Sequence, residues 1–280
     1  MLSIGDYTLQ TLDVQEFSLD GGSVFGAVPK VLWEKVIKPD HLNRVRLSMR
    51  LLLVRGYGRN ILVDAAMGTA WNDKMKQIYD LSEWRLDREL QKAGLRRGDI
   101  TDIIFTHLHF DHLAGAFEEE NGELVPVFPH ARYYVQQDNL QTALHPNLKE
   151  KPSYLSPFVE ALSRLDGLVP VKGGTELIPG LELVPAGKGH TEGHQLVRIT
   201  GSGKTLVHGG DLFPSSAHLG VTRGLTYDIA PLEVVGEKIV LLDEMVDKRV
   251  ILYFAHDPLI TAATLKRGEK HVVVDDILDF

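Results

Sequence analysis

The sequence has no cysteine among its 280 residues. Disulfide bonds, thiolate catalysis and cysteine-ligated zinc are therefore excluded for this chain. Any metal ion that the protein holds must be bound by histidine, aspartate or glutamate side chains, which narrows the site chemistry before any motif is considered.

Long apolar runs and an excess of positive charge are also absent. No segment approaches the ~20 apolar residues that a transmembrane helix needs, and the opening MLSIGDYTLQ lacks the basic and apolar regions of a secretory signal. The formal net charge is -8, and no cluster of Lys and Arg stands out. We therefore expect a cytoplasmic protein that binds neither membranes nor nucleic acids, because nucleic-acid binding favours a basic surface.

Short apolar runs rich in β-branched residues alternate with helical patterns, which predicts an α/β or α+β fold built in layers. Residues 48–54 and 61–64, joined across GYGRN, are typical of a β-hairpin. The expected strands are Tyr7–Leu12, Ser48–Val54, Ile61–Asp64, Asp102–Thr106, Arg132–Val135, Leu181–Pro185, Leu196–Thr200, Thr205–His208 and Val250–Phe254.

Three helices have clear starting points in the sequence. Ser82 is expected to cap a helix that stops at Gly94, and Ser156 followed by proline opens a second. Pro231 starts a third helix, whose apolar residues are Val234, Val235, Ile239, Leu242 and Met245.

No linker rich in Gly, Ser or Pro divides the chain, so we expect a single domain over residues 1–280. The stretches 18–46 and 137–157 have weak periodicity. Long irregular segments in a compact domain are often binding loops, and we expect this of both stretches.

Metal-binding residue types follow one of the expected strands directly. The strand ends at Thr106, and His107, His109, Asp111 and His112 come next. Residues i and i+2 of an extended backbone point the same way, so His107 and His109 can bind one ion. Asp111 and His112 follow where the chain turns and can reach a second ion nearby. Neutral imidazole nitrogens and carboxylate oxygens together suit zinc and related first-row ions.

Three more candidate ligands each follow an expected strand: His190 in GKGHTEGH, Asp211 in GGDLF and His256 in FAHD. Catalytic groups are often carried on loops that a rigid sheet holds in place. A single His or Asp at a strand end is usually a cap or a hydrogen-bonded turn residue. The repeated pattern nevertheless favours these three residues as the ligands that complete two metal sites.

In this order, THLHFDH, GHTEGH, GGD and FAHD resemble the motifs of the metallo-β-lactamase superfamily over roughly residues 48–256. The resemblance implies a four-layer αββα sandwich with two metal ions in a groove between the edges of its sheets. It implies the following ligands: His107, His109 and His190 for the first ion, Asp111, His112 and His256 for the second, and Asp211 as a bridge between them.

Several residues indicate which branch of this superfamily the chain resembles. The flavo-di-iron oxygen reductases have Glu where this chain has His109, and the commonest zinc β-lactamases use a Cys that this chain lacks. The spacings from His190 to Asp211 and on to His256 resemble those of N-acyl-homoserine lactonases. The segment from Asp20 to Trp33, with its pattern DGG…FG.VPK..W, resembles a lactonase-like branch that quenches quorum sensing and includes enzymes similar to organophosphate hydrolases.

One position departs from the lactonases that the chain resembles. Several of them have a Tyr three residues after the bridging Asp, where it can touch the substrate oxygen. This chain has Pro214 there. Tyr227 and Tyr133 are the candidates to replace it.

The resemblance implies a dinuclear metal hydrolase of a small-molecule ester, in first place a lactonase of the N-acyl-homoserine lactone type. The alternatives are an organophosphate or aryl ester hydrolase and, further behind, a mononuclear iron dioxygenase or a thioesterase similar to glyoxalase II. We expect two divalent ions, zinc before iron, manganese or cobalt. Asp111 and Asp211 are the expected catalytic residues, with Asp111 passing a proton to the leaving oxygen. Residues 18–46 would shape the substrate pocket or a homodimer contact.

Other residues are candidates for supporting roles. Asp64 and His194 are expected behind the metal ligands, which usually need hydrogen-bonded partners; a turn cap and a core histidine are the alternatives. Five apolar residues are candidates for a substrate pocket, although core packing is the favoured alternative: Phe25, Trp33, Phe110, Phe213 and Leu219.

Overall fold

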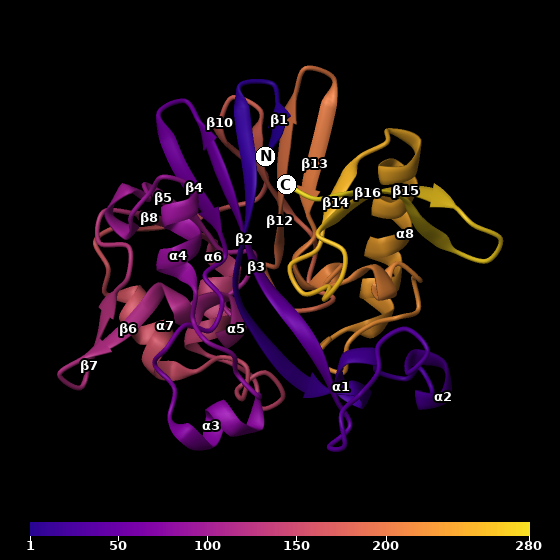
Figure 1. Cartoon of the computed structure of the whole chain (residues 1–280), viewed down its shortest axis with the longest axis horizontal. Coiled ribbons are helices and arrows are strands. Elements are labelled where there is room, and N and C mark those ends of the chain that lie inside the picture. Colours follow the sequence, from indigo (N-terminus) through magenta and orange to yellow (C-terminus); the bar gives the residue numbers. More distant parts are fainter.

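Two seven-stranded sheets lie face to face at the centre of the protein, and helices cover the outer face of each (Figure 1). The computed structural model describes all 280 residues. The architecture is the four-layer αββα sandwich that the sequence motifs implied. Both termini lie between the two halves of the molecule, near the hairpin ends of the sheets.

The first sheet changes from antiparallel to parallel along its width. β1 to β4 pair in antiparallel fashion, whereas β4, β5, β8 and β9 run parallel. The predicted hairpin is confirmed as β3 and β4, with Leu52 opposite Val63. In spatial order the strands are β1 (Leu2–Ile4), β2 (Tyr7–Asp20), β3 (Arg44–Gly56), β4 (Arg59–Val63), β5 (Asp102–Ile104), β8 (Arg132–Gln136) and β9 (Leu168–Val171).

The second sheet is antiparallel except where β13 and β14 run side by side in the same direction. A separate two-stranded hairpin is formed by β6 (Phe117–Glu120) and β7 (Glu123–Pro126). The strands of the second sheet are β10 (Thr175–Ile178), β11 (Leu181–Pro185), β12 (Gln195–Gly201), β13 (Lys204–His208), β14 (Ile251–Tyr253), β15 (Ala262–Arg267) and β16 (Val272–Leu278).

The helices divide between the two outer layers, with α4 to α7 beside the first sheet and α8 beside the second (Figure 1). Short 3-10 turns occupy residues 97–99, 114–116, 210–212 and 216–218. The helices are α1 (Gly21–Phe25), α2 (Lys30–Trp33), α3 (Asp73–Ile78), α4 (Leu86–Lys92), α5 (Phe110–Leu113), α6 (Gln137–Leu144), α7 (Ser156–Ser163) and α8 (Pro231–Asp247).

Side chains that point alternately to the two faces of the central strands fill two separate hydrophobic cores. In β3, Leu52 and Val54 belong to the core between the sheets, whereas Leu51 and Leu53 belong to the core under the helices. Successive strand residues point to opposite faces, so a run of consecutive apolar residues fills two cores at once. Both faces of β3 are therefore buried, one against each core.

Some expectations about local structure were wrong. Ser82 does not cap α4, because its hydroxyl accepts a hydrogen bond from the backbone N–H of Glu16 instead. Ile239 is 48% exposed, because α8 packs through Val234, Leu242 and Met245. The stretches 18–46 and 137–157 are not wholly irregular, since the first contains the end of β2, both short helices and the start of β3, and the second contains α6.

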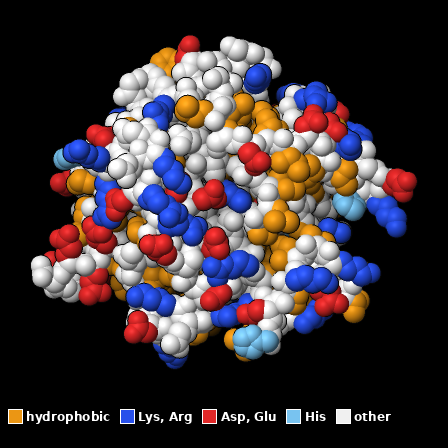
Figure 2. Space-filling view, viewed as in Figure 1, with side chains coloured by type: hydrophobic (Ala, Val, Ile, Leu, Met, Phe, Trp, Pro, Cys, Tyr) orange, Lys and Arg blue, Asp and Glu red, His pale blue; other side chains and the backbone are white.

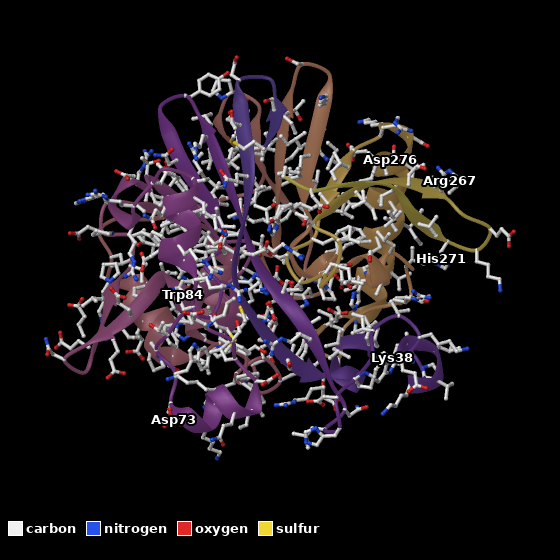
Figure 3. All side chains as sticks on the ribbon, in the orientation of Figure 1. Lys38, Asp73, Trp84, Arg267, His271 and Asp276 are labelled. Carbon is white, nitrogen blue, oxygen red and sulfur yellow. The ribbon has the colours of Figure 1, made fainter.

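Charged side chains of both signs are spread over the surface that Figure 2 shows, with Lys and Arg interspersed among Asp and Glu, and hydrophobic side chains gather right of the centre. Figure 3 places the labelled Lys38, Asp73 and Arg267 at the periphery, while the space between the sheets and helices is filled with side chains. None of the helices combines the length and the apolar composition that crossing a bilayer requires.

Candidate metal centre

The ends of strands from both sheets meet at one edge of the sandwich. β5 ends at Ile104, and the chain then runs through His107 and His109 into α5. On the other side, β13 and β14 are parallel, so the residues after both strands lie at the same edge. Asp211 follows β13 and His256 follows β14. His190 joins them from the connection between β11 and β12, so the two sheets together line the site.

The structure brings all seven ligands proposed from the sequence together in two groups. The first group contains His107, His109, His190 and Asp211, and the second contains Asp111, His112, Asp211 and His256. Within each group, one ligand atom from every residue lies within 4.8 Å of the others. Each group supplies four nitrogen or oxygen donors, which is the number and chemistry that a zinc-like ion takes.

Asp211 is the only residue that both groups share. Its Oδ1 lies 3.3 Å from His112 Nε2 and 3.4 Å from His256 Nε2, and its Oδ2 lies 3.5 Å from His190 Nε2. His107 Nε2 is buried without a hydrogen-bond partner and faces the same carboxylate at 4.0 Å. A buried polar atom without a partner is rare, and this one fits a metal ligand.

The charges in the cluster shift the protonation of its members strongly. Burial opposes charge on His112, but the carboxylates of Asp211, Asp111 and Asp64 outweigh it and hold the pKa of His112 well above its usual value. Burial, helped by the neighbouring histidines, places the pKa of His107 well below its usual value. Burial also raises the pKa of Asp111, so this carboxyl can carry a proton more readily than an exposed one. Such opposite shifts are typical of functional sites.

Hydrogen-bonded partners stand behind the ligands, as the sequence predicted for Asp64. Its Oδ2 accepts a hydrogen bond from His112 Nδ1 at 2.9 Å. His194 is buried and its Nε2 accepts from the backbone N–H of Asp211 at 3.1 Å, so it supports the shared ligand. His256 Nδ1 donates to the backbone oxygen of Ser48 at 2.8 Å.

Sequence reasoning missed one such partner, Asp228. Its Oδ1 accepts a hydrogen bond from His190 Nδ1 at 2.9 Å. Asp228 lies in an irregular segment before α8, where an aspartate normally indicates only a turn or a helix start. No local pattern in the sequence connects it with His190.

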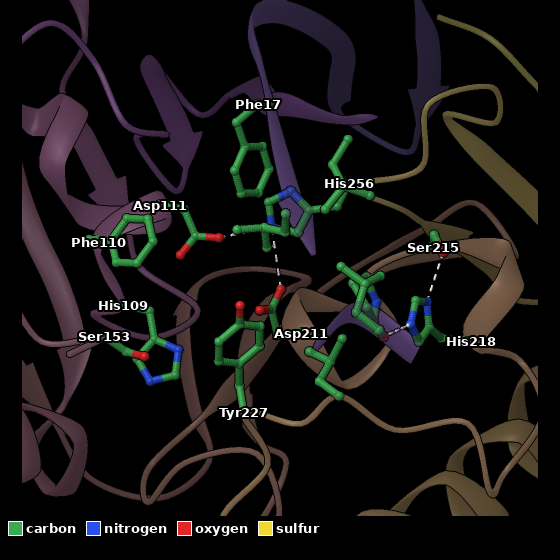
Figure 4. A pocket seen from close by; sticks show the side chains of 15 residues that line it. Phe17, His109, Phe110, Asp111, Ser153, Asp211, Ser215, His218, Tyr227 and His256 are labelled. Atoms are coloured by element: carbon green, nitrogen blue, oxygen red, sulfur yellow. Dashed lines mark hydrogen bonds and ion pairs between the residues drawn. The ribbon is translucent and has the colours of Figure 1, made fainter. Parts of the chain in front are cut away.

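A pocket opens directly on the two ligand groups (Figure 4). It encloses about 530 Å³, including its open mouth. Apolar walls come from β2, α1 and β3 and adjoin the metal-binding side, where the ring of Phe17 meets the ring of His256. Fifteen residues line the pocket: Phe17, Leu19, Val24, Leu47, His109, Phe110, Asp111, Ser153, Asp211, Pro214, Ser215, His218, Leu225, Tyr227 and His256.

The structure shows which of the five apolar candidates line the pocket. Phe110 lines the pocket, whereas Phe213 and Leu219 pack in the core under α8. Phe25 and Trp33 stack on each other beside the pocket, with ring centroids 5.2 Å apart.

The structure also distinguishes between the two tyrosines that could replace the one missing at position 214. Tyr227 lines the pocket and its hydroxyl points toward Asp211 (Figure 4), whereas Tyr133 is buried in the first sheet and donates to the backbone oxygen of Phe128. Tyr227 is therefore the tyrosine that can meet a substrate.

Comparisons with known proteins agree with this fold and centre. Residues 51–262 match the family model of the metallo-beta-lactamase superfamily. A "probable metallo-hydrolase" of Mycobacterium tuberculosis is 28% identical over 197 residues, which are 61% of this chain and 59% of that protein. An N-acyl homoserine lactonase of Bacillus thuringiensis is 29% identical over 181 residues, 62% of this chain and 63% of that enzyme. The chain thus spans about 60% of the length of these curated relatives.

A crystal structure covers nearly the whole chain. It is that of a probable metal-dependent hydrolase from Staphylococcus aureus, with a TM-score of 0.87 and 28% identity, over 99% of this chain and 100% of that one. These similarities support the enzyme class expected from the sequence, a metal-dependent hydrolase. The matched residues include all seven ligands of the two groups. This chain belongs to the metallo-beta-lactamase superfamily.

Proposed function

We propose that this protein is a hydrolase that uses two divalent metal ions, zinc in first place, to open lactones of the N-acyl-homoserine type. One observation carries the proposal: the carboxylate of Asp211 joins two four-residue ligand groups in a pocket that also has an apolar wall. Such a pocket suits a small molecule with a polar reacting group and an apolar tail.

The apolar wall is formed by side chains that are held rigidly. Phe17 is fully buried and its ring meets the ring of His256 edge-on, with centroids 5.4 Å apart. Leu47 and Val24 lie beside it in the same pocket, and both are buried. An acyl chain placed along this wall would direct its carbonyl group toward Asp211.

The residues divide the chemistry between them. Two bound ions would supply Lewis-acid polarisation of the carbonyl and activation of the attacking water. Asp111 faces the pocket, where its carboxyl can pass a proton to the leaving oxygen. The hydroxyl of Tyr227 can donate a hydrogen bond to the substrate oxygen on which negative charge develops.

The comparisons support the lactone as substrate. The B. thuringiensis relative is named an N-acyl homoserine lactonase, and its similarity extends over 62% of this chain. The mixed charges on the surface in Figure 2 offer no continuous basic area to a nucleic acid, which agrees with a small-molecule substrate.

A substrate panel tests the proposal. Zinc-loaded protein is given N-acyl-homoserine lactones of increasing chain length, a nitrophenyl ester and a paraoxon-like phosphotriester. Lactone opening is followed by the released proton and the other two reactions by the coloured phenol. We expect the lactones to be the best substrates and the Asp211→Asn variant to be inactive. Turnover of the aryl substrates alone would establish the alternative, and turnover of none would refute the proposal.

A further inference from the structure

Two of the five histidines in the ligand groups are backed by a carboxylate. His112 Nδ1 donates to Asp64 at 2.9 Å, and His190 Nδ1 donates to Asp228 at the same distance. Both aspartates are buried, with 2% of their surface exposed. His112 belongs to the second ligand group and His190 to the first, so each group has one charged partner behind it.

On the side of the ring that faces away from the metal cluster, the other three histidines have no carboxylate partner. His107 Nδ1 lies 3.1 Å from the hydroxyl of Thr106, and His256 Nδ1 donates to the backbone oxygen of Ser48. The ring of His109 packs edge-on against Tyr154, with centroids 4.7 Å apart. In each group, therefore, a carboxylate orients the ring of only one histidine.

Asp228 differs from Asp64 because it is bonded to a segment that forms part of the pocket wall, although its own side chain does not line the pocket. It follows Tyr227 directly, and its Oδ2 accepts a hydrogen bond from the backbone N–H of Leu225 at 2.8 Å. Leu225 and Tyr227 both line the pocket. Its two carboxylate oxygens thus connect a metal-ligand candidate with the segment that a substrate would contact.

The protein holds this segment in place from behind. Lys238 of α8 is buried and donates to the backbone oxygens of His218 at 3.0 Å and Arg223 at 2.7 Å. Beyond Asp228, the backbone N–H of Ala230 donates to the oxygen of Gly189 at 2.9 Å. Because both ends of the segment are anchored, the carboxylate of Asp228 is held in one position. Its hydrogen bond in turn holds the ring of His190.

Gly224 shows how closely the carboxylate is fitted. A Cβ atom at this position would lie 2.5 Å from Asp228 Oδ2, well inside van der Waals contact. The glycine leaves room for the carboxylate to reach both of its hydrogen-bond donors.

We propose that Asp228 is the positioning residue of the first ligand group: it fixes the ring of His190 for metal binding and couples that ion to the pocket wall. This inference rests on the proposed two-ion centre. A carboxylate hydrogen-bonded to a ligand histidine fixes its tautomer and raises its basicity, and its loss typically costs about 10- to 100-fold in metal affinity. In Asp228→Asn the amide offers an oxygen to only one of the two donors, and the negative charge is gone.

Metal release provides the test, independent of activity. Cobalt-loaded wild-type protein, Asp228→Asn and Asp64→Asn are mixed with a chromophoric chelator, and the number of ions released and their rates are recorded. We expect Asp228→Asn to bind one of its two ions about 10- to 100-fold more weakly than wild type. Anomalous diffraction from cobalt-loaded crystals then assigns the weakened ion to the first group, and the ion weakened by Asp64→Asn to the second.

Two further variants control for general damage. Asp102→Asn removes another fully buried carboxylate, paired with Arg132 at 2.9 Å, at the far end of β5, and should retain both ions as wild type does. Gly224→Ala keeps the carboxylate but displaces it, so it should weaken the same ion by a smaller factor even if Asp228→Asn does not fold.

The outcomes separate this inference from the proposed function. The role of Asp228 is refuted, and the hydrolase proposal stands, if wild type binds two ions and Asp228→Asn releases both at wild-type rates. Where Asp228→Asn does not fold, the same result with Gly224→Ala refutes the role. If Asp102→Asn weakened binding of the first-group ion equally, the role of Asp228 would also be refuted. A wild-type protein that binds fewer than two ions would refute the two-ion centre itself.

Discussion

Removing the metal ions should lower the thermal stability of this protein strongly, because each ligand group draws residues from both sheets. His107, His109, Asp111 and His112 follow β5 of the first sheet, whereas His190, Asp211 and His256 come from connections of the second. A bound ion would therefore tie the two sheets together at their common edge. The unfolded chain separates these residues and loses the site, so metal binding adds directly to folding stability.

The size of the effect follows from linkage. An ion present at about 1,000 times its dissociation constant stabilises the folded state by roughly 4 kcal/mol, so two independent ions give about 8 kcal/mol. One kcal/mol moves the melting temperature by roughly 2–4 °C in chains of 150–250 residues, which predicts a shift of about 15–30 °C here.

Calorimetry measures this shift. The protein is scanned after dialysis against a chelator and again after refilling with zinc. Asp211→Asn serves as the control, because it alters the one ligand that both groups share and should show a much smaller shift. A melting temperature that metal leaves unchanged in the wild-type protein would refute the reasoning.

Three further predictions concern single residues. Asp211→Asn should lower lactone turnover at least about 100-fold, the upper range for partners that lie behind the ligands, without loss of the folded circular dichroism spectrum; full activity would contradict its role. Tyr227→Phe should lower kcat about 10- to 100-fold, less than the ~10²–10³ of a sole oxyanion donor, and an unchanged kcat would exclude its hydroxyl from the reaction. Burial lowers the pKa of Lys238 to about 8 from 10.5. Between these values the unfolded chain binds more protons, so the free energy of unfolding should rise with pH. Denaturant titrations should show this rise in wild type and in the control Lys248→Met, whose side chain is 70% exposed, but not in Lys238→Met.

The elements predicted best from sequence are those whose pattern is local. The short apolar runs Ser48–Val54 and Ile61–Asp64 identified both strands of the β3–β4 hairpin, although the structure extends the first to Arg44–Gly56. The ligand motif at His107 to His112 is local in the same sense, because two-residue spacing at a strand end determines which side chains point together.

Edge elements were missed for a physical reason. β15 and β16 at the edge of the second sheet were not predicted, although Val272–Leu278 is rich in β-branched residues. Its apolar residues are half-exposed and Asp275 and Asp276 interrupt them. Paired acidic residues in an apolar run look like a turn, whereas here Asp275 forms an ion pair with Lys266 on the neighbouring strand at 3.0 Å. The pairing that stabilises this strand is invisible until its neighbour is known.

The two carboxylates behind the histidines show where sequence reasoning stops at the site. Asp64 follows β4, and β4 is the parallel neighbour of β5, so its place at a strand end near the site was enough to suggest that it orients a ligand histidine. The structure shows that this histidine is His112. Asp228 has no strand to place it. Its contact with His190 depends on the buried amine of Lys238 and on backbone hydrogen bonds to the connection that carries His190. A ligand motif can thus be recognised from spacing alone, whereas the residues that set its geometry are determined by how distant segments pack.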